Sequence, residues 1–400
     1  MITEARPDPI GVVHIISGLQ IGGAEMMLYR LLQTMDKEVF PSQVVSMTDE
    51  GALGPAIRDL GIPLHTLAMK RGLPDPFSLL PAARILKQAC PAIVQTWMYH
   101  ADLFGGLTAR LSGGPPVVWG IHHTGLGPAG SHFTTSWTVR LNAALSSRLP
   151  RRIVCCSQAT RDMHERLGFD NRKMVVIPNG FDLQVFRPEP RAGDALRQEL
   201  GIPPGAGLVG MIARFHPQKD HRTFLEAAAQ LHASRPEVHF VLCGPGVTAE
   251  NAELAGWIGS AGLGACIHLL GPRRDTQPIY AALDVFCLSS SHGEGFPLVV
   301  GEAMACAVPC VVTDVGDSAS IVGETGIVVP PRDPEALGQA LRRMLAMGSA
   351  ARRRMGELAR RRIETDFRLE DTARQYEDLY RRLAPTGRAS AASGGQAAHA

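Results

Sequence analysis

The chain has 400 residues, of which 45% are hydrophobic and 20% are charged, and its formal net charge is +2. These values predict two globular domains with sizeable cores, and they argue against nucleic acid as the main partner. No apolar run reaches the roughly 18 residues of a membrane span, and residues 1–7 lack the apolar segment of a secretory signal.

The eight cysteines indicate the redox compartment in which the protein is found. They include no Cys-x-x-Cys pair, and most of them lie inside apolar runs. We therefore expect free, buried thiols rather than disulfides or metal ligands. Together with the missing signal segment, this composition predicts a cytoplasmic protein.

Apolar runs alternate with longer helical patterns along the whole chain, which is typical of parallel βαβ units. In the N-terminal half the runs predict strands at residues 10–17, 42–47, 64–68, 92–98, 117–121, 153–157 and 174–178. Gly22 and Gly23 follow the first strand and lead into a helix predicted over residues 26–34. A glycine pair lets backbone approach a ligand, and a helix start favours a phosphate, although a plain turn is the alternative.

Histidines follow two neighbouring strands of this half. His100 comes after the strand at 92–98, and His122 and His123 come after the strand at 117–121. A single histidine at a strand end is more often structural, but three of them favour a functional site. A metal site is not indicated, because no carboxylate lies at a convincing ligand spacing.

An apolar stripe lies between residues 133 and 152. Trp137, Leu141 and Leu145 recur at helical spacing, and three arginines follow them at positions 148, 151 and 152. Packing of the stripe on the sheet is the favoured interpretation. The alternative is a surface helix that rests on anionic lipid.

The domain boundary is predicted at a change of composition. Pro178-Asn179-Gly180-Phe181-Asp182 ends the first half in a turn, and residues 183–207 are rich in Pro, Arg, Glu and Gly. We therefore assign residues 1–182 to an N-terminal domain, 183–207 to a linker and 208–383 to a C-terminal domain. The tail at residues 384–400 has the composition of a disordered segment.

The C-terminal half repeats the alternating pattern. Strands are predicted at residues 208–213, 238–243, 267–271, 284–290 and 308–314, and helices at 221–232, 336–347, 351–367 and 369–383. Arg214 and Lys219 lie five residues apart in the loop after the first of these strands. Two cations in such a loop are either solvated charges or an anion site.

Two glutamates eight residues apart carry most of the functional prediction. Glu294 lies in a glycine-rich turn after the strand at 284–290, and Glu302 lies about two helical turns further on. Open α/β sheets bind ligands at the carboxyl ends of their strands, so both acids are expected to reach into one cleft. The alternative is that Glu294 caps the helix while Glu302 faces solvent.

Glu-x7-Glu with Gly295-Phe296-Pro297 directly after the first glutamate resembles the signature of retaining, nucleotide-sugar-dependent glycosyltransferases of family four. The resemblance covers roughly residues 10–383 and includes Gly-Gly-Ala-Glu at 22–25 and Arg-x4-Lys at 214–219. It implies the GT-B fold, with two Rossmann-like, doubly wound parallel-sheet domains facing a cleft and the last helix returning to the N-terminal domain.

The activity implied by the resemblance is metal-independent and uses no cofactor. A sugar would move, with retained anomeric configuration, from a nucleotide diphosphate sugar to a glycan or lipid-linked acceptor in cell-surface polysaccharide synthesis. Arg214 and Lys219 would neutralise the departing diphosphate, helped by the backbone of Gly22 and Gly23. The departing phosphate would take the acceptor's proton on the front face of the sugar, because no carboxylate nucleophile is evident.

The resemblance also implies roles for other residues. Glu294 would hold hydroxyls of the sugar and Glu302 the ribose. His100 would contact the transferred sugar as the second histidine of a His-x-His pattern, although Met98 stands where many members have the first. The remaining donor-binding candidates are Gly244, Arg273, Gly295, Phe296, Pro297 and Leu298.

Two other functions compete with this prediction. A GT-B nucleotide-sugar epimerase would need general acid/base carboxylates, whereas the best acids here match donor-holding positions. A catalytically inactive nucleotide-sugar-binding protein is the second alternative, and the intact cation pair argues against it. The region from Trp137 to Arg152 further predicts peripheral contact with anionic membrane at its cytoplasmic face.

Overall fold

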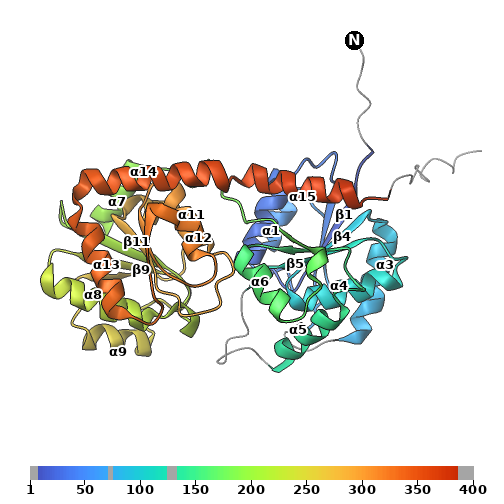
Figure 1. Ribbon diagram of the computed structural model, residues 1–400, viewed down its shortest axis with the longest axis horizontal. Helices are drawn as coiled ribbons and strands as arrows, with labels where there is room; N and C mark the ends of the chain where they lie inside the picture. Colours follow the sequence, from blue (N-terminus) through green and yellow to red (C-terminus); the bar gives the residue numbers. More distant parts are fainter. Residues whose placement is uncertain (1–7, 71–74, 124–132, 386–400) are drawn as a thin grey trace, which may run out of the picture.

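The computed structural model describes residues 8–70, 75–123 and 133–385, so most of the predicted tail lies outside the described residues. Two sheets, one from each half of the chain, lie side by side along the long axis (Figure 1). The helices α14 (Gly348–Asp366) and α15 (Leu369–Leu383) run end to end along one edge and join the two halves (Figure 1).

The N-terminal sheet is parallel, with strand order β3-β2-β1-β4-β5-β6-β7. Its strands are β1 (Val12–Ile16), β2 (Ser42–Ser46), β3 (Leu64–Thr66), β4 (Ile93–Trp97), β5 (Val117–Ile121), β6 (Arg152–Cys155) and β7 (Met174–Val176). Its helices are α1 (Gly23–Thr34), α2 (Gly54–Asp59), α3 (Leu79–Ala89), α4 (Tyr99–Leu111), α5 (Phe133–Leu145) and α6 (Gln158–Arg166), with short 3-10 turns at Pro76–Ser78 and Asn171–Lys173.

The C-terminal sheet is also parallel, with strand order β10-β9-β8-β11-β12-β13. Its strands are β8 (Leu208–Ile212), β9 (His239–Cys243), β10 (Ile267–Leu269), β11 (Val285–Leu288), β12 (Cys310–Thr313) and β13 (Gly326–Val329). Its helices are α7 (Pro190–Glu199), α8 (His221–Ser234), α9 (Ala252–Ser260), α10 (Gln277–Ala282), α11 (Leu298–Ala305), α12 (Ser318–Val322) and α13 (Pro334–Ala346), with 3-10 turns at Pro217–Lys219 and Gly323–Thr325.

Burial on both faces explains why the strands were recognisable. β1, β4, β5 and β8 are buried along their whole length, because helices cover both sides of each sheet. Such strands appear in a sequence as continuous apolar runs, and all twelve predicted strands are present in the described residues, together with β13, which was not predicted. All eight cysteines are free thiols and seven are buried, as predicted, while Cys90 is exposed. No helix in the described ranges is long and apolar enough to cross a bilayer.

A helix lies where only a linker was expected. α7 begins at Pro190, and proline is well tolerated in the first turn of a helix, where its missing N–H costs nothing. α7 packs on α10, and Gly193 lies so close to it that a Cβ there would come within 2.3 Å of the Ala281 carbonyl oxygen. The proline-rich composition of residues 183–207 therefore hides an ordered element.

The chain passes between the two domains twice, near Phe181 and near Arg368, and these two segments lie side by side. The Phe181 N–H donates to the Phe367 carbonyl oxygen at 2.9 Å, and the Leu369 N–H donates to that of Phe181 at 3.1 Å. The Phe181 ring stacks on Phe296 of the C-terminal domain. Beyond this crossing α15 packs into the N-terminal core, where the Tyr380 hydroxyl donates to Gln95 at 3.1 Å. The last helix thus belongs to the N-terminal core.

Each sheet reverses its strand order at one point, between β1 and β4 in the first sheet and between β8 and β11 in the second. Open α/β sheets bind ligands beyond the carboxyl ends of the strands at such a reversal. The loops after β8 and β11 contain Arg214, Lys219 and Glu294, and the loop after β1 leads to Gly22 and Gly23 at the start of α1. Topology thus places the predicted residues at both reversals.

Candidate active site

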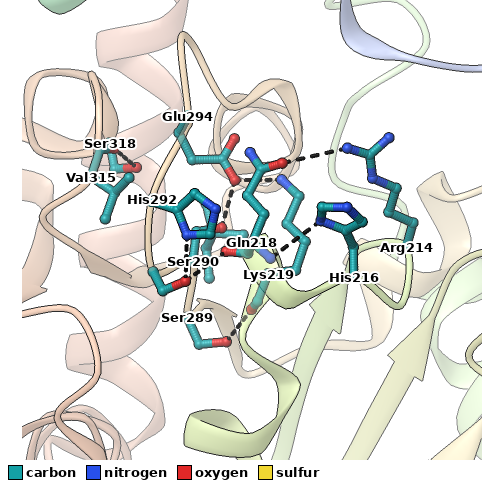
Figure 2. A network of polar contacts seen from close by, with 12 residues as sticks. Arg214, His216, Gln218, Lys219, Ser289, Ser290, His292, Glu294, Val315 and Ser318 are labelled. Carbon is teal, nitrogen blue, oxygen red and sulfur yellow. Dashed lines mark hydrogen bonds and ion pairs between the residues drawn. The ribbon is translucent and has the colours of Figure 1, made fainter. Parts of the chain in front are cut away.

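The loops that follow β8 and β11 meet in a network of polar contacts (Figure 2). The Lys219 ammonium forms an ion pair with Oε1 of Glu294, and the Ser290 hydroxyl donates to the same oxygen at 2.5 Å. The side chains of Lys219 and Glu294 are only 16% and 7% exposed. Residues 75 positions apart in the sequence therefore form a largely buried pair of opposite charges.

The protonation state of Glu294 follows from this pair. Burial alone would raise the pKa of the Glu294 carboxyl, but the charge of Lys219 and the hydrogen bonds from Lys219 and Ser290 outweigh it. The pKa of Glu294 therefore lies below its ordinary value of 4.5. At neutral pH the group is an ionised hydrogen-bond acceptor.

Arg214 lies beside the pair on the solvent side. Its Nη2 donates to Oε1 of Gln218 at 3.4 Å, and Figure 2 shows its guanidinium close to the Lys219–Glu294 contact. Gly244, after β9, supports the loop from behind, because a Cβ there would lie 2.2 Å from the Ala213 carbonyl oxygen. The loop that carries Arg214 therefore packs so closely on Gly244 that only glycine fits at this position.

Side-chain hydrogen bonds tie the two loops together. The Ser289 hydroxyl lies 2.9 Å from the Lys219 carbonyl oxygen and 3.1 Å from that of Asp220, and the Thr313 hydroxyl donates to the Ser290 carbonyl oxygen at 2.6 Å. Gly293 has a φ of +75°, a conformation that favours glycine. The position of Glu294 is therefore determined by both flanking strands.

A histidine of the N-terminal domain faces this cluster. A Cβ at Gly293 would lie 3.5 Å from Cε1 of His123, which shows how closely His123 approaches the loop after β11. Burial lowers the pKa of His123, Glu294 opposes that shift, and the charges of Arg214, His292 and Lys219 add to it. His123 is accordingly a neutral imidazole, with its Nδ1 buried and unpaired among the described residues.

The glycine pair lies where α1 begins. Gly22 is the N-cap of α1 and supplies no side-chain cap, while its backbone is extended. The first-turn N–H groups of a helix have no partner in the preceding turn and attract anions. Gly22 and Gly23 therefore bring backbone rather than their own side chains to this point, where the Glu25 carboxylate of the first turn also lies against Gly22.

His100 occupies a different place from the cluster. It lies in the first turn of α4, its Nε2 is buried, and burial lowers its pKa. Within the described part of the chain, no hydrogen bond or ion pair connects it with the loops of Arg214 and Glu294. The structure instead brings His123 to those loops. β4 and β5 are neighbours in the sheet, so the residues after β5 lie at the same edge as those after β4. This adjacency is the signal in the sequence that could have identified His123.

Glu302 is separate from Glu294 and is almost fully enclosed. It lies in α11, its Oε1 accepts from Nη2 of Arg30 at 2.6 Å, and its Oε2 accepts from the Tyr280 hydroxyl at 2.9 Å. The sequence predicts that Glu302 reaches into a cleft, but it gives no indication that Arg30 and Tyr280 hold its carboxylate.

Of the other candidates, residues 295–298 lie at the start of α11, whereas Arg273 lies elsewhere. Gly295 contacts the N-terminal domain, because a Cβ there would lie 2.9 Å from the His122 carbonyl oxygen. Phe296 is buried, Pro297 is the N-cap of α11 and Leu298 its first residue. Arg273 lies apart from the cluster and forms an ion pair with Glu199 of α7 at 2.9 Å.

The loops after β8 and β11 combine complementary chemical groups, and the start of α1 lies at the strand reversal of the other sheet. Arg214 and Lys219 supply positive charge, Glu294 supplies an ionised acceptor, and the start of α1 supplies backbone donors. Cations and N–H donors suit a phosphate, and a buried carboxylate suits hydroxyl groups. Such a site fits a ligand that carries phosphates and hydroxyls together.

Two family descriptions match the chain. Residues 21–185 match "Glycosyltransferase Family 4", and residues 206–347 match "Glycosyl transferases group 1". Among curated relatives, the "Putative glycosyltransferase EpsF" of Bacillus subtilis is 28% identical over 313 residues, covering 76% of this chain and 79% of the relative. The "UDP-Gal:alpha-D-GlcNAc-diphosphoundecaprenol alpha-1,3-galactosyltransferase" of Escherichia coli is 28% identical over 319 residues with the same coverage.

Among solved structures, Alr3699/HepE of Anabaena in complex with UDP superposes with a TM-score of 0.82 at 22% identity. The superposition covers 94% of this chain and 100% of that one. The likeness thus extends over both sheets and their relative arrangement.

Proposed function

The chain belongs to the group 1 glycosyltransferases of family 4 and has the GT-B fold, and we propose that it transfers a sugar from a nucleotide diphosphate sugar, without a metal ion and with retention of configuration. The proposed acceptor is a glycan or lipid-linked molecule in cell-surface polysaccharide synthesis. The observation that carries the proposal is the Lys219–Glu294 pair with Arg214 beside it, at the strand reversal of the C-terminal sheet.

The two cations account for departure of the nucleotide diphosphate. Negative charge grows on the diphosphate as its bond to the sugar breaks, and preorganised positive charge stabilises that state. Lys219 is held in place by Glu294 in a largely buried pair, and exposed Arg214 is oriented by its contact with Gln218. In this proposal they supply the charge that a divalent cation supplies elsewhere, and the α1 start adds backbone donors.

The state of Glu294 supports front-face transfer. A double displacement needs a carboxylate free to attack the anomeric carbon. Oε1 of Glu294 already accepts from Lys219 and Ser290, which lowers its nucleophilicity. We therefore assign Glu294 to holding sugar hydroxyls, with the departing phosphate taking the acceptor's proton. His100 remains a proposed sugar contact, and His123 joins it because it faces the cluster.

The similar proteins suggest which substrates to test first. HepE has been solved with UDP and with UDP-glucose, and the Escherichia coli relative is named for UDP-galactose and a diphosphoundecaprenol-linked sugar. We propose a uridine diphosphate sugar as donor and a polyprenyl-diphosphate-linked sugar as acceptor. The donor-binding roles of Gly244, Arg273 and residues 295–298 remain part of this proposal.

A surface of the N-terminal domain supports peripheral contact with anionic membrane. Trp137 and Leu141 of α5 are 56% and 46% exposed, so packing of this stripe on the sheet is wrong for both residues. The α5 face that packs inward carries Val139 and Ala143 instead. Leu107 and Leu111 are exposed on neighbouring α4, and Arg140 lies over the Trp137 ring. Exposed apolar side chains with Arg140 beside them suit an anionic bilayer surface, and we propose that the enzyme lies at the cytoplasmic face of the membrane.

A donor panel tests the proposal. The protein is incubated with UDP-, GDP- and ADP-sugars, with and without a polyprenyl-diphosphate sugar, and released nucleoside diphosphate is measured. Acceptor-dependent release is the expected result. Conversion to an isomeric nucleotide sugar would favour an epimerase, and binding without turnover would favour an inactive binding protein.

A further inference from the structure

Arg30 is a buried cation in the middle of α1. Its side chain is 7% exposed, and its Nη2 donates to Oε1 of Glu302, whose side chain is 10% exposed, at 2.6 Å. The two residues are 272 positions apart and belong to different domains. A buried charge pair of this kind is costly to desolvate, so its presence is weak evidence for a purely stabilising role.

The surroundings hold both oxygens of Glu302. Its Oε2 accepts from the Tyr280 hydroxyl at 2.9 Å, and the Arg30 guanidinium lies 5.2 Å from the centre of the Phe186 ring. Phe186 in turn packs edge-on against Tyr280. The carboxylate is therefore fixed by α1, by α10 and by the segment that connects the domains.

Anchoring leaves hydrogen-bonding capacity on the carboxylate. An ionised carboxylate has about four lone-pair positions, and the two anchors use one on each oxygen. The second position on each oxygen remains, which is the arrangement that a pair of neighbouring hydroxyls requires. Nη1 of Arg30 is buried without a partner among the described residues, so the guanidinium also keeps an unused donor.

We propose that Arg30 is a positioning residue that aims the Glu302 carboxylate at the ribose hydroxyls of the donor nucleotide. The inference rests on the proposed function, since it takes Glu302 as the ribose acceptor. Arginine suits the role because its rigid, planar guanidinium donates in a fixed direction and stacks on Phe186. Arg30 lies on the helix that begins at Gly22 and Gly23, so α1 serves the diphosphate with its first turn and the ribose through Arg30.

Ribose discrimination distinguishes positioning from general disruption. Calorimetry compares UDP with 3′-deoxy-UDP and 2′-deoxy-UDP on the full-length protein. Hydrogen bonds to a charged acceptor predict that the wild type prefers UDP by about ten- to a hundred-fold. In Arg30→Met the preference is expected to fall below about threefold, whereas Arg30→Lys keeps a charge near Glu302 and retains part of it. A merely structural defect would weaken all three ligands equally.

A double variant shows whether Arg30 acts through Glu302. Arg30→Met alone leaves a buried charge unpaired, so it can fail to fold, whereas Arg30→Met/Glu302→Gln removes both charges. The double variant is expected to match Glu302→Gln within about twofold in ribose preference, because coupled residues are not additive. Arg222→Met is the matched control, since Arg222 pairs with Glu226 on the surface of α8.

The possible results distinguish the role of Arg30 from that of Glu302. Loss of ribose preference in Glu302→Gln with full preference in Arg30→Met, or additive losses in the double variant, overturns the role of Arg30 and leaves that of Glu302 intact. Full preference in Glu302→Gln overturns the ribose assignment itself, and the role of Arg30 with it.

Discussion

Replacing Lys219 by Met removes the counter-charge of Glu294 while keeping a side chain of similar length. Glu294 is nearly inaccessible to water, so its ionised carboxylate would be left unpaired. Removing one partner of a buried pair costs about 3–5 kcal/mol of folding free energy. For a domain of this size, that loss lowers the melting temperature by about 6–20 °C. The loss of Lys219 is therefore expected to affect folding stability as well as turnover, although the residue lies in a loop.

The loss of stability should depend on pH with a defined sign. In the wild type the pKa of Glu294 is lowered, so the pair stabilises the fold fully above pH 4.5. This contribution is lost as the pH falls through the lowered pKa of the folded state. Without Lys219, burial dominates and the pKa of Glu294 rises. The variant then recovers stability as pH falls toward 4.5, because the carboxyl becomes neutral. The deficit should be full at pH 8 and smaller at pH 5.

Urea denaturation of both proteins at pH 8 and pH 5 measures the deficit. Lys219→Met/Glu294→Gln should restore stability at pH 8 without restoring turnover, which should remain at least about 10²–10³-fold below wild type. Arg222→Met, which breaks an exposed pair, should cost less than about 1 kcal/mol at either pH. An equal deficit at both pH values, or no rescue by glutamine, would refute the reasoning from the buried pair.

Three further predictions concern the ligands. Glu302→Ala should weaken UDP binding by about ten- to a hundred-fold, whereas Glu294→Ala should leave it nearly unchanged while turnover collapses, as measured by calorimetry and product release. Transfer should survive excess EDTA, because Arg214 and Lys219 supply the positive charge. Trp137→Ser with Leu141→Ser should reduce flotation on anionic vesicles, and added salt should reduce flotation of the wild type.

Each of these predictions has a contradicting outcome. Loss of UDP affinity in Glu294→Ala but not in Glu302→Ala would exchange the two roles. Activity that EDTA abolishes and Mg²⁺ or Mn²⁺ restores would end the metal-independent account. Equal failure to float on neutral and anionic vesicles would remove the membrane surface, and Phe77→Ser, at a side chain that is 84% exposed elsewhere, controls for loss of any apolar group.

The sequence was sufficient for most of the fold because its central strands are buried on both faces. Such strands form continuous apolar runs, and the turns between them carry glycine and proline. α7 was missed since Pro188, Glu189 and Pro190 look like a linker, although proline is well placed at a helix start. The exposure of Trp137 was also missed, because helical spacing identifies a stripe but not the side that it faces.

The site was less accessible to sequence reasoning, because its contacts depend on strand order. The sequence indicates Lys219 and Glu294 by separate motifs, and their pairing depends on β8 lying beside β11. His123 was noticed at a strand end, but only the strand order and the packing of the domains show that it faces Glu294. Arg30 gave no signal, since it lies mid-helix between Tyr29 and Leu31 and its partner is in the other domain.

The central claim is that this chain moves a sugar with retention and without a metal. The most direct measurement is proton NMR of the product formed from an α-linked UDP-sugar and a polyprenyl-diphosphate sugar in EDTA, with Arg214→Ala and Lys219→Met/Glu294→Gln in parallel. The account predicts an α-linked product and stoichiometric UDP from the wild type, with rates about 10²–10³-fold lower in the variants. A β-linked product, or wild-type rates in the folded variants, would contradict it.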